Sequence, residues 1–296
     1  DIICAFHADM IAGTNLDINL LKYLEKGKVI SATRVEPPLH PPGPEKMIKD
    51  YGVEPKDFSM DEWNSTNVLL EKPGEKTNGI FAPWCMYKED FLSIGGHDEL
   101  FAPQSREDSD LFNRFLLNDY ELIQPWDALV YHFTSRGSRF NKYSGGDIGK
   151  DSPEWQQTNR KNMRNFIRKW GTMVKHDSHM KPQVSHKYDI GFVIKNCSYE
   201  VLYELEPWCS TIYGDYPKDM LPMYIRAEKD NTLFDLTERV KDYNQPKNND
   251  IIISFDVKEL SAEHFNFISN LSDVITESGE VGEMEYDIFN IKINKL

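Results

Sequence analysis

The sequence has no long hydrophobic run and no excess of basic residues. Its longest apolar stretches, residues 128–133 and 250–255, have the length of a strand and fall far short of the ~20 residues that cross a bilayer. We therefore expect no membrane span. With 48 acidic against 34 basic residues, the formal charge of −14 repels nucleic acid and anionic membrane surfaces. This charge excludes a general nucleic-acid-binding role.

Cysteine is scarce, and the start of the chain lacks the features of a secretory signal. The four cysteines are widely spaced and form neither a CxxC pair nor a dense framework, which favours buried free thiols. Residues 1–6 have no basic start and no cleavage site, and they are typical of a strand already under way. These absences predict a cytoplasmic protein. A content of 40% hydrophobic and 28% charged residues predicts a chain that folds throughout.

The chain length and the order of its patterns predict two α/β domains. A length of 296 residues favours two cores over one, and the polar stretch 175–187 is typical of a linker. We therefore expect a first domain over residues 1–180 and a small second domain over residues 188–296. Strands are expected at 1–6, 28–35, 80–87, 120–123, 128–133, 188–194, 251–255 and 286–293, and helices at 15–26, 88–94, from 107 onward, 152–170, 198–208, 232–243 and 262–274.

Two local patterns give more detail in the first domain. Thr14 and Asp17 have the spacing of a capping box at the start of the helix expected over 15–26. Residues 36–44 contain five prolines, which exclude both a helix and a central strand. We interpret residues 36–44 as an extended loop.

Acidic and histidine side chains follow or begin three of the expected elements. His7-Ala8-Asp9 follows a strand, Glu107-Asp108 opens a helix, and His132 lies in the strand expected over 128–133. Taken singly, a turn aspartate, a favourable helix start and a core histidine are the commoner explanations. Taken together, carboxylates and an imidazole suit a divalent cation, Mn²⁺ or Mg²⁺, that also holds a diphosphate.

Several motifs occur in an order that is specific to one family. After His7-Ala8-Asp9 come Phe81-Ala82-Pro83-Trp84, then Gly95-Gly96-His97-Asp98-Glu99, then Arg106-Glu107-Asp108, and finally His132. In this order and spacing, residues 1–140 resemble the C-terminal two-thirds of a family 2-like, galactosyltransferase-like glycosyltransferase domain with the A-type fold. The resemblance covers roughly half of the chain, and the run from Gly95 to Asp110 is its most specific part.

The resemblance implies an inverting, metal-dependent hexosyltransferase that moves a sugar from a nucleotide-sugar donor to a hydroxyl of a glycan or another acceptor. Asp108 would be the general base and Glu107 would support it, while Asp9, His7 and His132 would bind the metal. Arg136 and Arg139 are candidates for donor phosphate binding, although surface arginines are an equal alternative. The acceptor would be bound by Trp84, Gly95, Gly96, His97 and Asp98.

Three departures from the family pattern qualify this implication. His7 replaces the first aspartate of the usual DxD motif, and His97 replaces an aromatic residue. The family also opens with strands and helices that hold the nucleoside, and this chain starts after them. We therefore expect this chain alone to bind donor weakly.

Two other classes of function compete with this one. A non-catalytic carbohydrate- or protein-binding module on a degenerate glycosyltransferase fold would explain His7, whereas the intact Glu107-Asp108 pair argues against decay. A metal-dependent phosphoryl or nucleotidyl transferase normally has two carboxylates on one metal-binding strand. The segment His7-Ala8-Asp9 offers only one.

Overall fold

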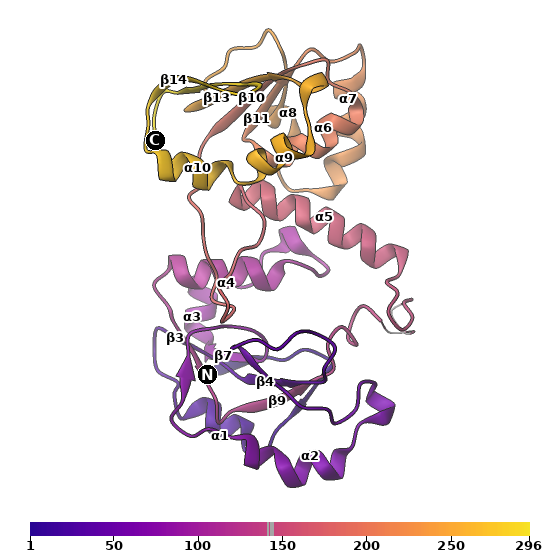
Figure 1. Cartoon of the computed structure of the whole chain (residues 1–296), viewed down its shortest axis with the longest axis vertical. Coiled ribbons are helices and arrows are strands. Elements are labelled where there is room, and N and C mark those ends of the chain that lie inside the picture. The colour runs from indigo at the N-terminus through magenta and orange to yellow at the C-terminus, as the bar shows by residue number, and fades with distance from the viewer. Residues whose placement is uncertain (141, 143–144) are drawn as a thin grey trace. The chain divides into compact units, whose positions relative to one another are not determined.

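A computed structural model of the protein describes residues 1–140, 142 and 145–296 and shows an α/β protein with mixed sheets and flanking helices (Figure 1). The chain divides into two compact units. The first comprises residues 1–159 and 174–183, and the second comprises residues 160–173 and 184–296. Within the described part of the chain, no helix has the length and apolar character that a membrane crossing requires.

The first unit contains two sheets. The five-stranded sheet has the order β1-β7-β3-β8-β6, and the four-stranded sheet has the order β2-β9-β4-β5. Their strands are β1 (Ile2–Ala5), β2 (Met10–Ala12), β3 (Lys28–Ser31), β4 (Thr33–Glu36), β5 (Lys46–Ile48), β6 (Lys76–Thr77), β7 (Trp84–Tyr87), β8 (Glu121–Pro125) and β9 (Leu129–His132). The strand expected over 28–35 is interrupted at Ala32, whose amide donates to the Pro83 carbonyl oxygen. The chain thus passes from one sheet into the other.

Strand β1 lies at the edge of its sheet, which corrects the expectation of a buried strand. It pairs only with β7 in this sheet, and the side chain of Ile2 is 45% exposed. Because β1 is hydrogen-bonded to a neighbouring strand on one side only, the segment 7–9 follows from the rim of the sheet rather than from its centre.

The helices of the first unit are α1 (Leu16–Leu21), α2 (Met60–Thr66), α3 (Lys88–Ser93), α4 (Glu107–Leu117) and the first turns of α5 (Pro153–Trp170). The predicted capping box at Thr14 and Asp17 is wrong. Helix α1 begins after Asn15, which has φ 56° and makes no side-chain cap, and the Thr14 amide donates instead to Asn67 Oδ1. The prediction of α5 over 152–170 is confirmed.

Residues 174–183, which include most of the linker expected over 175–187, belong to the first unit. A bridge pairs His176 with Pro182, and the Gln183 amide donates to the Lys175 carbonyl oxygen. The segment is therefore a short hairpin that folds back onto the first unit.

The second unit is built on one six-stranded sheet. Its order is β12-β11-β10-β13-β15-β14, with parallel pairing from β12 to β13 and antiparallel pairing of β15 and β14. The strands are β10 (Ile190–Lys195), β11 (Thr211–Gly214), β12 (Val240–Asp242), β13 (Ile251–Asp256), β14 (Gly282–Tyr286) and β15 (Phe289–Ile293). The helices are α6 (Tyr199–Leu205), α7 (Met220–Glu228), α8 (Leu236–Arg239), α9 (Ala262–Ser269) and α10 (Leu271–Ser278).

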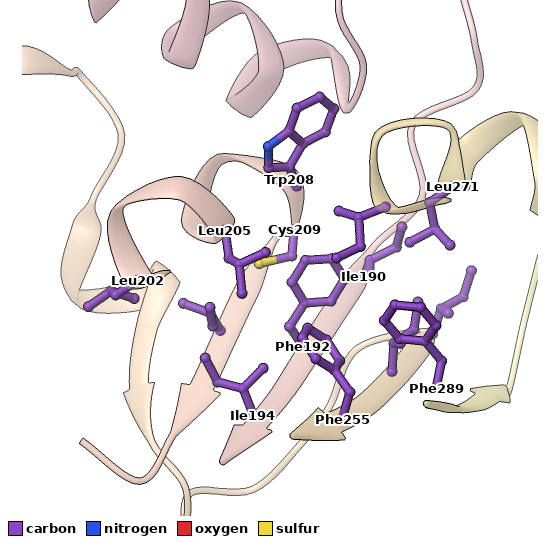
Figure 2. Packing of buried hydrophobic residues seen from close by; sticks show 14 of the residues in the cluster. Ile190, Phe192, Ile194, Leu202, Leu205, Trp208, Cys209, Phe255, Leu271 and Phe289 are labelled. Carbon is purple, nitrogen blue, oxygen red and sulfur yellow. The ribbon is translucent and has the colours of Figure 1, made fainter. Parts of the chain in front are cut away.

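Three expectations in the second unit are wrong. The helix expected over 232–243 is the short helix α8 followed by strand β12, and the segment 209–231 contains β11 and α7 instead of a loop. The helix expected over 262–274 is divided into α9 and α10 at Asn270. The core beneath these elements combines aliphatic and aromatic side chains. Figure 2 shows Phe192, Phe255 and Phe289 within it, whose successive ring centroids lie 5.7 and 5.1 Å apart.

A buried ion cluster lies in the second unit. Glu206 is fully buried, and its carboxylate accepts hydrogen bonds from Arg168, Arg239 and the Tyr224 hydroxyl. These partners occupy both carboxylate oxygens. Burial alone would raise the pKa of Glu206, but the charges of Arg239 and Arg168 lower that pKa to about 2.

Candidate functional site

The acidic start of α4 lies between two cavities of the first unit. Ser105 and Arg106 both have a left-handed backbone, with φ 79° and 74°, so the chain turns abruptly into the helix. Glu107 and Asp108 then occupy the first turn, where the helix dipole favours negative charge. The helix start was predicted from the sequence and is confirmed.

Asp9, which lines the large cavity, lies in a backbone nest. The residue is 8% exposed, and its Oδ2 accepts the amides of Arg136 and Gly137 at 2.9 and 3.0 Å. These two hydrogen bonds fix the carboxylate through Oδ2 and do not involve Oδ1. The loop that follows β9 therefore orients Asp9, which was expected to bind metal.

The imidazole of His132 lies beside Asp9 Oδ1. Its Nε2 lies 3.7 Å from Asp9 Oδ1, and its Nδ1 lies 2.8 Å from Glu36 Oε1. A proton on Nδ1 satisfies the Glu36 bond and leaves the Nε2 lone pair facing Asp9. Asp9 and His132 thus form a pair of adjacent oxygen and nitrogen donors.

Glu36 is a residue of this site that the sequence reasoning missed. It is 1% exposed, and it accepts from Arg34 at 2.9 Å and from Lys46 at 3.0 Å in addition to His132. Burial alone would raise the pKa of Glu36, but the hydrogen bond to His132 and the charge of Arg34 lower that pKa to about 2. The spacing of Arg34 and Glu36 on one strand face was the available signal, since alternate residues share a face.

His7 lines the same large cavity as Asp9 and His132, but its ring contacts Asp108, so its place in the metal set stays a prediction. A hydrogen bond of 3.0 Å joins its Nε2 to Asp108 Oδ2. Although burial would lower the pKa of His7, the hydrogen bond and the charge of Asp108 raise that pKa overall. Among the described residues no group of three or more His, Cys, Asp or Glu side chains is arranged to hold a metal ion.

Two cavities meet at the α4 start. The large cavity, of about 700 Å³, is lined by His7, Asp9, Glu36, His132 and Arg139 among others. The small cavity, of about 310 Å³, is lined by Arg106, Asp108, Phe112, Trp155, Lys175 and His176 among others. Phe81, Gln104, Glu107 and Ser138 line both. The cavities are therefore neighbours.

Glu107 is the most unusual acid of this site. Its Oε2 is buried and has no hydrogen-bond partner among the described residues. Burial, followed by the charge of Asp108, raises the pKa of Glu107. An unsatisfied carboxylate oxygen at the junction of two cavities is a feature that a bound ligand would satisfy.

The two candidate donor-binding arginines are already engaged. Arg136 donates to Glu54 at 2.7 Å and to the Thr134 carbonyl oxygen at 2.8 Å, and it lines neither cavity. Arg139 lines the large cavity but forms a bidentate pair with Asp151, with both contacts at 2.9 Å. Only Arg139 is therefore positioned to reach a ligand in that cavity.

The five residues expected to bind acceptor line neither cavity. Trp84 is 1% exposed and packs on Phe115 in the core, so its ring offers no open face for stacking. The turn after α3 has φ 87° at Gly95 and 63° at Gly96, and His97 packs on Phe91 while Asp98 caps the next turn through the Leu100 amide.

The Gly95-Gly96 turn supports α4. Arg114 in α4 donates to the carbonyl oxygens of Ile94 and Gly96 and pairs with Asp110 at 2.9 Å. The turn thus fixes the helix that presents Glu107 and Asp108. Contact of this turn with an acceptor stays a prediction.

Comparison with known proteins adds no identification. A scan against models of protein families gives no match, and a search of curated proteins gives no match either. What the site does must therefore be argued from its own residues.

Proposed function

We propose that the protein is a metal-dependent, inverting glycosyltransferase with an A-type fold that moves a sugar from a nucleotide-sugar donor to a hydroxyl acceptor. The observation that carries the proposal is the acidic start of α4, where Glu107 lines both cavities and Asp108 lines the small one. Transfer needs a donor site and an acceptor site that meet at a base. Two neighbouring cavities with an acidic helix start between them support this proposal.

Asp108 is the proposed general base. It lines the small cavity, and its Oδ2 is held by His7 at 3.0 Å. In the transfer step the acceptor hydroxyl gives its proton to Asp108 as its oxygen bonds to the anomeric carbon. The bond from that carbon to the donor phosphate breaks, and its electron pair leaves with the nucleoside diphosphate.

Asp9 and His132 are the proposed metal ligands. A carboxylate oxygen and an imidazole nitrogen 3.7 Å apart fit a hard divalent cation that takes its remaining ligands from water and from substrate phosphates. A bound Mn²⁺ or Mg²⁺ would neutralise the diphosphate of the donor. Glu36 orients His132, and the backbone nest orients Asp9.

One observation favours the rival binding module. His7 contacts Asp108, so the candidate metal site retains one carboxylate and one imidazole. A module of this kind would bind a glycan equally well with and without Mn²⁺, and it would release no nucleoside diphosphate from any nucleotide sugar.

Release of nucleoside diphosphate from a panel of nucleotide sugars, with Mn²⁺ and simple glycosides as acceptors, tests the proposal. Asp108→Asn keeps the shape and removes the base, so release should fall ~10²-fold or more. Asp17→Asn is the matched control, because Asp17 is an exposed first-turn carboxylate of α1. Equal release from the wild type and Asp108→Asn would remove the catalytic role of Asp108.

A further inference from the structure

Arg106 is a half-buried arginine whose side chain makes no hydrogen bond or ion pair with any described residue. It lines the small cavity. Every other arginine that is buried or half-buried pairs with a carboxylate, namely Arg34, Arg114, Arg136, Arg139, Arg164, Arg168 and Arg239. A guanidinium removed from water without a counter-ion is costly. A ligand anion would satisfy it.

The rest of the small cavity has both cationic and apolar walls. Lys175 and His176, from the hairpin over residues 174–183, add two basic side chains although the chain carries a net charge of −14. Phe112 and Trp155 supply aromatic surface. These walls suit a ligand that has an anionic group beside an apolar or sugar-ring face.

We infer that the small cavity is an acceptor site for a hydroxyl compound that carries a carboxylate or a phosphate, with the anion bound by Arg106 and the reactive hydroxyl facing Asp108. This inference rests on the proposed function, because the ligand is an acceptor only if the protein transfers a sugar to it. The bidentate guanidinium fork matches both anions. It would hold the acceptor at the α4 start, one residue before Glu107 and two before Asp108.

A structural role for Arg106 makes a different prediction. Burial lowers the pKa of Arg106, and the charge of Glu107 opposes that shift, so the charges of Arg106 and Glu107 also act on each other. If that were its whole role, substitution would affect charged and neutral acceptors equally. If Arg106 binds the ligand, the protein should prefer anionic over neutral ligands. If Arg106 only positions other residues, it should show no such preference.

Equilibrium binding of three matched glycosides without donor tests the inference. The probes are p-nitrophenyl β-glucoside, p-nitrophenyl β-glucuronide and the 6-phosphate of the glucoside, measured by calorimetry with the full chain. The wild type should bind at least one of the two anionic glycosides about tenfold or more tightly than the neutral one. The stronger of the two identifies the preferred anion as carboxylate or phosphate.

Arg106→Gln should abolish the preference, and Arg106→Lys, which keeps the charge without the fork, should keep a smaller one. Thermal unfolding of each variant controls for loss of structure. The inference is overturned by equal binding of the three glycosides, by absence of binding, or by an unchanged preference in Arg106→Gln. The binding measurement contains no donor, so it is independent of the assay of nucleoside diphosphate release. If the wild type prefers the anionic glycosides but cleaves no nucleotide sugar, the proposed function is refuted and the anion site is retained.

Discussion

Glu206 in the second unit and Glu107 in the first unit both have buried carboxylate oxygens, but they differ in their partners and in the direction of their pKa shifts. Glu206 in the second unit is fully buried, and arginines and a tyrosine hydroxyl occupy its oxygens. Glu107 in the first unit has a buried oxygen without a partner and lines two cavities. The pKa of Glu206 is lowered to about 2, whereas that of Glu107 is raised. We therefore assign Glu206 a structural role and Glu107 a place in the site.

The largest effect that this comparison predicts is on folding. Glu206→Gln removes the carboxylate that pairs with Arg239 and leaves Arg168 only its contact with Glu228 at 3.4 Å. Loss of one partner of a buried ion cluster costs about 3–5 kcal/mol. Urea unfolding should show this loss in the free energy of unfolding. Glu204→Gln, at an exposed position of α6, is the control and should change little. A loss under about 1 kcal/mol for Glu206→Gln would contradict the structural role of the cluster.

The second prediction concerns pH. Because the folded pKa of Glu206 is lowered from 4.5 to about 2, its ionised form stabilises the second unit fully above pH 4.5. That contribution, roughly 3 kcal/mol, is lost as the pH falls from 4.5 toward 2. Hydrogen exchange of the β10 and β13 amides should report it. Equal acid sensitivity of the wild type and Glu206→Gln in this range would disprove the assignment.

The third prediction concerns Glu36. Glu36→Gln removes the carboxylate that orients His132, and loss of such an outer partner typically weakens metal binding ~10–100-fold. Mn²⁺ titration measures the change. Glu45→Gln serves as the control, since Glu45 is near Arg34 and Lys46 but no hydrogen bond joins it to His132. Equal Mn²⁺ affinity of the wild type and Glu36→Gln would show that Glu36 serves only the fold.

The smallest predicted effect is at Glu107. A raised folded pKa means that the ionised form is disfavoured by folding, so Glu107→Gln should leave the free energy of unfolding unchanged or raise it by up to about 1 kcal/mol. Urea unfolding at pH 7 provides the value. Destabilisation as large as that of Glu206→Gln would erase the contrast between the two acids.

The sequence predicted those elements whose signals are local. Helix α5 was predictable from the Ser152-Pro153 start, the spacing of its apolar residues and Gly171 after its end. The acidic start of α4 was also predictable, because its signal lies in neighbouring residues of the sequence. Strand β13 also follows directly from its apolar run.

The features that the sequence did not predict depend on distant partners. The break at Ala32 requires the Pro83 carbonyl, the role of Glu36 requires His132, and the hairpin over 174–183 requires the rest of the first unit. His7 was assigned to the metal because of its neighbour Asp9, but the nearest acceptor in space is Asp108. Such pairings depend on tertiary contacts that no local pattern encodes.

The measurement that tests the central claim most directly is Mn²⁺ binding, followed by electron paramagnetic resonance, with and without inorganic pyrophosphate. Pyrophosphate stands in for the donor diphosphate and needs no nucleoside site. We predict that pyrophosphate strengthens Mn²⁺ binding, that Asp9→Asn weakens this ternary binding about tenfold or more, and that Asp108→Asn changes it less than about twofold. Absence of Mn²⁺ binding by the wild type, or equal losses in the two variants, would contradict the separate roles proposed for Asp9 and Asp108.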